Sequence, residues 1–322
     1  MKTPLPWMIG PLVAMAICNF SGAQLAAPPL GRELGQFFIA ITLGLYFTPA
    51  VAVEVLGNAA VLIVAALGAI VIGYVSSRVL ARLSGIDDAT AFFASVPGGA
   101  MEMANLADRF GAAVDKVAVS HSLRILVVVC VLPILISIAN VHGGDIYRPV
   151  LVPFSWAGLL PLFAIAVGGG VLFTLVRFPN PWMMGPLIAT IVTTATGYEF
   201  SSMSGVLSNC GQVLLGCALG TRFSRRFLRD APRFVAVVLL CILLMVLLSA
   251  AMAWGLSRMA GIFWPSMILA TAPGGIAEMS ITARTLQLGV ALVTAAHVTR
   301  VLVILTFTLP GYDLLRRIRG SK

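Results

Sequence analysis

The sequence predicts an all-α polytopic membrane protein with two inverted-topology repeats, each holding a broken or re-entrant helix at Pro-Gly-Gly. Hydrophobic residues make up 59% of the 322 residues and charged residues 10%, and the mean hydropathy is +1.01. Soluble domains are about one-quarter charged. In addition, long apolar runs recur along the chain, and the motif Pro-Gly-Gly-x-x-Glu-Met occurs twice at a separation of 176 residues.

Five apolar stretches, with their flanks, reach the length that crosses a bilayer, which is about 20 residues for a helix. They are Val61–Ser76, Val117–Ala139, Trp156–Val176, Phe234–Leu256 and Ala291–Leu309. The net charge of +9 comes from basic residues in short loops and at the C-terminus, as membrane topology requires. We therefore expect the lipid bilayer, and no nucleic acid, as the macromolecular environment.

Matches in the same order predict an internal duplication. Pro6–Leu12 resembles Pro181–Leu187, both reading Pro-Trp-Met-x-Gly-Pro-Leu, and further paired motifs follow at a constant offset. We place the first repeat at residues 1–141, a connecting loop at 142–153 and the second repeat at 154–322. The first repeat lacks a counterpart of the first helix of the second.

The second repeat is the more complete one and defines the expected helices. These are Phe154–Arg177, Pro181–Gly197, Ser204–Phe223, Arg233–Arg258, the broken segment Trp264–Thr285, and Val290–Tyr312. If the broken segment is re-entrant, most Lys and Arg fall on the cytoplasmic side together with the Arg222–Arg233 loop. If it crosses fully, the basic residues divide almost equally, so the positive-inside rule favours inverted repeats.

The broken segments are the first candidate site. Pro removes an amide donor and Gly loosens the backbone, and within a bilayer such a break has to be buried in protein or line a wet cavity. The helical half that follows presents free amides and a positive dipole end, where an anion can bind. The alternative is that Gly-Gly merely lets two hairpins cross closely. The residues concerned are Pro97, Gly98, Gly99, Pro273, Gly274 and Gly275.

Arg124 and Arg300 fall well inside their predicted helices, and His121 and His297 precede them by three residues on the same helix face. An unpaired Arg at the centre of a membrane helix costs at least about 2.5–3.5 kcal/mol. Each Arg therefore needs either a structural partner or an anionic ligand.

Glu102 and Glu278 lie in the first turn after each break. Such a carboxylate either caps the free amides or serves as a proton or cation site in the membrane. Ion pairs of Glu102 with Arg124, and of Glu278 with Arg300, are the expected internal partners.

The sequence contains no motif for disulfide, metal or enzymatic chemistry. The five cysteines are scattered without a C-x-x-C pair, and three histidines do not form a copper or iron site unless carboxylates join them. Phosphate-binding, dinucleotide-binding and hydrolase motifs are missing from the sequence. We therefore expect no catalytic residue, no metal, no cofactor and no enzymatic activity.

The paired Pro-Trp-Met-x-Gly-Pro-Leu and Pro-Gly-Gly-x-x-Glu-Met motifs, followed by helices with Arg124 or Arg300, resemble the duplicated membrane proteins of the AbrB family. That family is also labelled as ammonia monooxygenases and is unrelated to the soluble DNA-binding AbrB. The resemblance covers nearly the whole chain. It implies a multi-pass protein of the bacterial inner membrane whose family name came from an effect on gene expression.

Three functions remain open. The first is a secondary transporter of a small anionic or zwitterionic solute, with H⁺ or Na⁺ as coupling ion, because interrupted helices in inverted repeats form transporter sites. The second is a membrane regulator of gene expression, and the third a membrane monooxygenase. The sequence leaves the oligomeric state open, with a homo-oligomer as one option.

Overall fold

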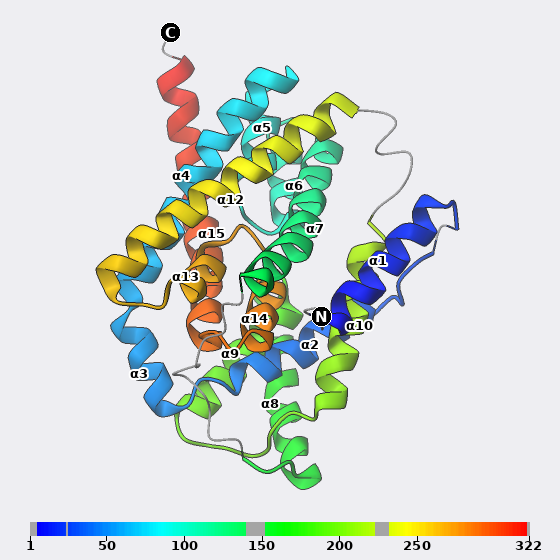
Figure 1. Cartoon of the computed structure of the whole chain (residues 1–322), viewed down its shortest axis with the longest axis vertical. Coiled ribbons are helices and arrows are strands. Elements are labelled where there is room, and N and C mark those ends of the chain that lie inside the picture. The colour runs from blue at the N-terminus through cyan, green and yellow to red at the C-terminus, as the bar shows by residue number, and fades with distance from the viewer. Residues whose placement is uncertain (1–4, 24, 140–151, 223–231, 321–322) are drawn as a thin grey trace. The chain divides into compact units, whose positions relative to one another are not determined.

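The computed structural model describes residues 5–23, 25–139, 152–222 and 232–320 (Figure 1). Within these ranges the regular elements are helices and no strand occurs. Most of the expected connecting loop and of the basic loop after residue 222 lies outside the described residues. The all-α prediction is thus confirmed for the part of the chain that is described.

Among the described residues, five helices are long and apolar enough to cross a membrane. They are α4 (Ala59–Ser84), α7 (Val114–Ile138), α8 (Trp156–Leu175), α12 (Pro232–Ala260) and α15 (Val290–Gly320). Each coincides with one of the five apolar stretches predicted from the sequence. The fold is therefore that of a polytopic membrane protein.

Shorter helices occupy the predicted positions before the first span and between the third and fourth spans. They are α1 (Pro6–Phe20), α2 (Gly31–Gly44), α9 (Pro181–Ala195) and α10 (Gly205–Gly220). A further helix, α3 (Pro49–Gly57), was not predicted, and it lies at 90° to α2. Proline occupies the first turn of α1, α3 and α9, where its missing amide has no partner to lose.

Both Pro-Gly-Gly motifs interrupt helices as predicted. The first separates α5 (Asp88–Ser95) from α6 (Ala100–Arg109), and the second separates α13 (Trp264–Thr271) from α14 (Ile276–Thr285). The last residue before each Pro leaves the helix for an extended conformation, with ψ of 128° at Val96 and 141° at Ala272. This is the conformation that a following proline imposes.

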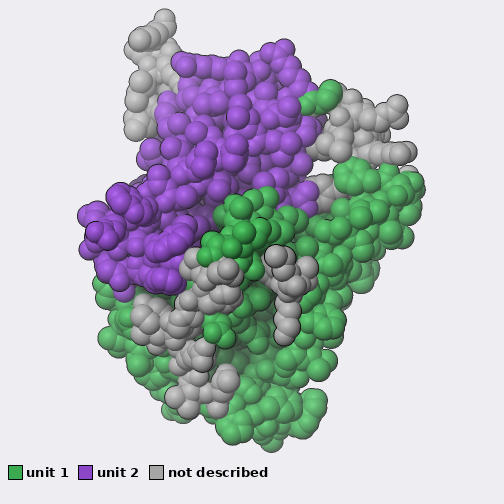
Figure 2. Space-filling view, in the orientation of Figure 1, with its two compact units in different colours: residues 1–57, 129–232, 276–294 green, residues 58–128, 233–275, 295–322 purple. Residues whose placement is uncertain are grey.

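The chain forms two compact units, coloured separately in Figure 2. Unit 1 comprises residues 1–57, 129–232 and 276–294, and unit 2 comprises residues 58–128, 233–275 and 295–322. Each unit therefore takes segments from both halves of the sequence. The division of the chain into two inverted repeats stays a prediction from the sequence.

In unit 1, α1 packs on α10, α10 on α2, α2 on α9 and α9 on α8. Figure 1 shows α1 and α10 side by side. At the α2–α10 crossing, a Cβ atom on Gly35 would lie 2.9 Å from the carbonyl oxygen of Gly211, and one on Gly211 would lie 3.1 Å from that of Gly35. The two backbones therefore touch at equivalent glycines of the predicted repeats.

Aromatic and aliphatic side chains hold α2, α8 and α9 together in unit 1. The buried cluster consists of Phe37, Ile41, Leu162 and Ala166, with Leu45, Trp182 and Met203 among the partly buried residues packed on it. Phe37 makes edge-on ring contacts with Phe163 and Trp182, a favoured aromatic geometry. This hydrophobic core packs against the C-terminal half of α2.

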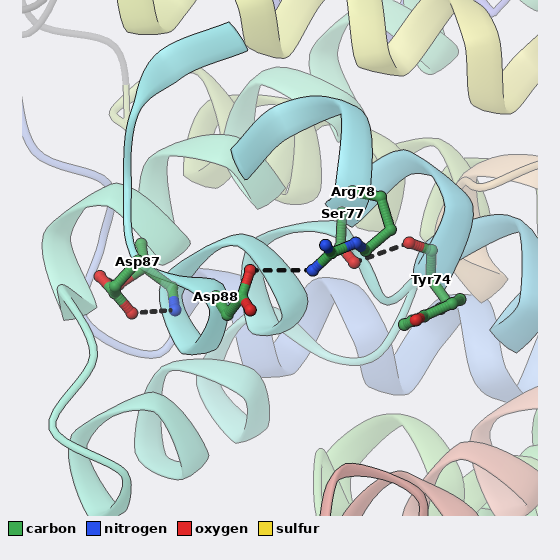
Figure 3. A network of polar contacts seen from close by, with 6 residues as sticks. Tyr74, Ser77, Arg78, Asp87 and Asp88 are labelled. Atoms are coloured by element: carbon green, nitrogen blue, oxygen red, sulfur yellow. Dashed lines mark hydrogen bonds and ion pairs between the residues drawn. The ribbon is translucent and has the colours of Figure 1, made fainter. Parts of the chain in front are cut away.

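In unit 2, Asp87 fixes the start of α5 by accepting hydrogen bonds from the amide of Thr90 at 2.7 Å and from its hydroxyl at 2.6 Å. The Thr90 hydroxyl in turn accepts from the amide of Ala113, next to α7. Nearby, Arg78 pairs with Asp88 at 3.0 Å (Figure 3). Burial by itself raises the pKa of Asp87. The hydrogen bonds from Thr90 lower the pKa by more than burial raises it, so the pKa lies below the usual 3.8.

Candidate functional site

Each motif proline leaves one carbonyl without its helical donor. In a continuous helix the amide of residue 97 would bond to the carbonyl of Phe93, and that of residue 273 to the carbonyl of Leu269, but proline has no amide hydrogen. The last regular bonds are those of Val96 to Phe92 and of Ala272 to Ile268. A buried carbonyl without a donor costs about 1–3 kcal/mol.

Two histidines, at the same spacing after each motif proline, replace these missing donors. Nε2 of His121 on α7 lies 2.9 Å from the carbonyl oxygen of Phe93, and Nε2 of His297 on α15 lies 3.0 Å from that of Leu269. Since a carbonyl oxygen only accepts, Nε2 carries the proton in both rings. Both histidines are completely buried. Their position 24 residues after the proline therefore has a structural reason.

The arginines bond to the carbonyls of the break itself. Arg124 donates to Val96 at 3.4 Å and to Gly98 at 3.3 Å. Arg300 donates to Ala272 at 2.6 Å and to Gly274 at 2.5 Å. A positive charge beside the last carbonyls of a helix is favourable because that end of the helix dipole is negative. Both breaks thus have the same local geometry at an offset of 176 residues.

The two breaks differ in the hydrogen bond at Nδ1 of the histidine. The Nη2 atom of Arg124 also donates to Nδ1 of His121 at 3.0 Å, which fixes that ring as neutral with its proton on Nε2. Nδ1 of His297 has no hydrogen-bond partner within the described residues. All four side chains belong to unit 2, and both arginines are buried, with 4% and 5% of their surface exposed.

The predicted ion pair between Glu102 and Arg124 is wrong. Both residues are described, and no ion pair joins them within the described chain; Arg124 bonds to carbonyls and to His121 instead. The Glu102 carboxylate turns back over Gly99, where it occupies the place that a Cβ on that glycine would take. Among the described residues, none of the first amides of α6 donates a hydrogen bond to the Glu102 carboxylate, so this carboxylate is not a helix cap.

Glu278 lies in the first turn of α14, in unit 1, and is buried. It interacts electrostatically with Arg222, just after α10. The pKa of Arg222 is lowered by partial loss of water around the guanidinium and by Arg32, while the charge of Glu278 opposes that change. The expected pair of Glu278 with Arg300 stays a prediction.

Two residues that support the first break were missed in the sequence. The hydroxyl of Ser120 on α7 donates to the carbonyl of Ala94 at 2.9 Å. A Cβ on Gly73 of α4 would lie 3.0 Å from Cα of Val96 and 3.1 Å from Cδ of Pro97, so glycine lets α4 pass close to the break. Ser120 stands one residue before His121, which is the signal that could have identified it.

The described residues contain no group of three or more His, Cys, Asp or Glu side chains placed to hold a metal ion. Chemically, the arrangement stabilises a helix break with neutral imidazoles and cationic guanidiniums. It leaves the amide end of α6, whose N-cap is Gly99, without a side-chain cap.

Comparison with known proteins gives consistent matches over most of the chain. The family model described as "Transition state regulatory protein AbrB" matches residues 7–316. The chain is 27% identical to "Uncharacterized protein YhjN" of Bacillus subtilis (strain 168), with 98% of this chain and 88% of that protein covered. It is 26% identical to "Putative regulator AbrB" of Escherichia coli (strain K12), with 94% of this chain and 87% of that protein covered. The chain belongs to the AbrB family.

Proposed function

We propose that this protein is a secondary transporter of a small anionic or zwitterionic solute in the bacterial inner membrane. One observation carries the proposal: each broken helix has its carbonyl end held by a buried His and Arg, and the amide end of α6 has no side-chain cap. Helix amide ends at such interruptions are where transporters bind anionic groups. The solute would therefore bind at Gly98–Gly99 and at Gly274–Gly275.

The carboxylates beside the breaks are the proposed coupling groups. Glu102 makes no hydrogen bond among the described residues, and Glu278 is buried next to a basic residue. A carboxylate in such a place can exchange a proton or hold Na⁺. In this proposal the arginines hold the break in shape and keep the site positive, and no chemical bond of the solute is changed.

The test begins with a thermal-shift screen of the purified protein against organic anions, amino acids and Na⁺, since a ligand of the folded state raises its stability. A stabilising compound is then supplied in radiolabelled form to proteoliposomes. We expect Gly98→Leu and Gly274→Leu to abolish uptake while the protein inserts normally. Gly10→Leu serves as the control because no atom lies within 4 Å of a Cβ at Gly10.

Coupling is tested with Glu102→Gln and Glu278→Gln, which keep the side-chain shape and remove the charge. Uptake by these variants should no longer respond to a proton or Na⁺ gradient, whereas Glu33→Gln, at an exposed position in α2, should behave as the parent. Unchanged uptake in both glycine variants would refute the site, and unchanged gradient dependence would refute the coupling role.

A regulatory function is the second candidate, and the names given to the family and to the Escherichia coli relative favour it. The basic loop after Arg222 is the segment available to contact a cytoplasmic partner under the predicted topology. Neutralising its arginines should abolish capture of that partner and leave solute uptake intact. Loss of uptake without any loss of partner capture would argue for transport alone.

A further inference from the structure

Unit 1 contains a cavity that neither of the proposed functions uses. Its volume is about 70 Å³, which is space for roughly five water molecules and hence for a small molecule with about as many non-hydrogen atoms. The walls come from the end of α2, the end of α9, the loop before α10, the segment before α8 and the end of α14. The lining includes Thr42, Thr194, Glu199 and Arg284.

Arg284 gives the cavity a cationic group. Its Nη1 atom donates to the hydroxyl of Ser208 at 2.7 Å, which fixes the direction of the side chain. Guanidinium carries five N–H donors, and within the described residues the others have no protein partner. A carboxylate is the group that this planar set of donors binds best, because it accepts two parallel hydrogen bonds.

Thr194 adds a buried hydroxyl. Only 3% of this residue is exposed, and its Oγ1 atom has no hydrogen-bond partner in the described chain. The neighbouring Thr193 bonds to the carbonyl of Ala189 in the usual way, as Thr42 does to Phe38. A buried hydroxyl without a partner is unfavourable, so a ligand that bonds to it in the cavity would remove this cost.

The cavity also favours a positive group. It is lined by residues from the last turns of α2 and α9 and by Arg284 in the last turn of α14, and helix C-termini carry partial negative charge. Glu199 adds an exposed carboxylate to the lining. Binding groups for an anion and for a cation thus occur within one small space.

We propose that this cavity is a binding site for a small zwitterion of amino-acid size, with the carboxylate on Arg284 and the ammonium group towards Glu199 and the helix ends. The hydroxyl of Thr194 bonds to the bound molecule inside the cavity. The inference does not depend on the proposed transport, because it concerns binding at equilibrium to residues of unit 1.

The test measures binding of tritiated glycine to the full chain in nanodiscs by scintillation proximity. Unlabelled glycine should compete, while acetate and methylammonium, which each carry one of its two charges, should need at least tenfold higher concentrations. Arg284→Gln should weaken glycine binding at least tenfold, since a charge-assisted hydrogen bond contributes a factor of that order. Thr194→Val should weaken it roughly two- to tenfold.

Matched controls separate the cavity from general effects. Thr193→Val removes a hydroxyl from the same helix outside the cavity, and Arg258→Gln removes an exposed arginine from the last turn of α12; both should bind glycine within twofold of the parent. Because Arg284→Gln also loses the bond to Ser208, its melting temperature is recorded, and Thr194→Val provides the independent variant. Absence of glycine binding by the parent, unchanged binding in both cavity variants, or equal affinity for acetate would overturn the proposal.

The outcome is also distinguishable from failure of the transport proposal. In Gly98→Leu, which should abolish uptake, the part of glycine binding that depends on Arg284 and Thr194 should persist. If Gly98→Leu instead abolished glycine binding while Arg284→Gln left it intact, glycine would bind at the break, and the cavity would not be a site.

Discussion

The histidines at the two breaks differ in the bonds that they make, and this predicts different losses of stability. His297→Leu removes one hydrogen bond, to the carbonyl of Leu269. An unsatisfied buried carbonyl costs about 1–3 kcal/mol, whereas measured side-chain hydrogen bonds in a membrane protein average about 0.6 kcal/mol and reach about 1.7 kcal/mol. We therefore expect His297→Leu to lower the free energy of unfolding by about 1–2 kcal/mol.

His121→Leu removes the equivalent bond to Phe93 and also the acceptor for Arg124. A bond to a charged group contributes about 1.5–3 kcal/mol, so this variant should lose about 2–4 kcal/mol. At roughly 2 °C per kcal/mol, the melting temperatures should fall by about 2–4 °C for His297→Leu and about 4–8 °C for His121→Leu.

The assay is thermal unfolding in detergent with a thiol-reactive dye, whose signal rises above the baseline set by the exposed Cys210 when the buried Cys241 becomes accessible. Ser122→Ala is the control on α7, since the hydroxyl of Ser122 bonds only to its own helix at Ala118. An equal or reversed order of the two histidine variants would refute the bonding assigned to the breaks.

Three further outcomes are expected. In a Pro273→Ala background, where an amide is restored, His297→Leu should lose less stability than in the parent, and an equal loss in both backgrounds would contradict the role given to the proline. Asp87→Asn should lower the melting temperature at pH 7, because a carboxylate whose pKa is lowered by folding stabilises the folded protein above its unfolded pKa. Protonation removes this stabilisation, so the difference between variant and parent should disappear as the pH falls below 3.8. Melting curves of both proteins over a pH series check this. Gly35→Ala should lose about 1–3 kcal/mol by overpacking against the facing helix, whereas Gly10→Ala, which has open space, should be neutral or slightly stabilising in the same unfolding assay.

The sequence predicted the spans and the breaks because both depend on local composition. Long apolar runs can satisfy their backbone only as helices in a membrane, and a proline followed by two glycines interrupts a helix wherever it occurs. The spacing of His121 and Arg124 likewise placed both side chains on one helix face. These features needed no knowledge of which helices pack together.

The partners of the buried residues could not be predicted in the same way. Burial of Arg124 follows from its place in an apolar run. The sequence does not show whether backbone carbonyls or a carboxylate accept the hydrogen bonds of its guanidinium. Only the packing of α7 on the first break brings the carbonyls of Val96 and Gly98 within reach. The cavity around Arg284 was missed for the same reason, because its lining comes from segments far apart in the sequence.

The energetics of the breaks favour a functional origin over close packing alone. A continuous helix would satisfy the carbonyls of Phe93 and Leu269 with its own amides. The observed arrangement instead uses a buried imidazole and a buried guanidinium at each break, and placing Arg in a membrane helix costs at least about 2.5–3.5 kcal/mol. Glycines at the α2–α10 crossing already achieve backbone contact without any break. Close approach therefore does not require the interruption, and this supports the proposal that the breaks serve a solute site.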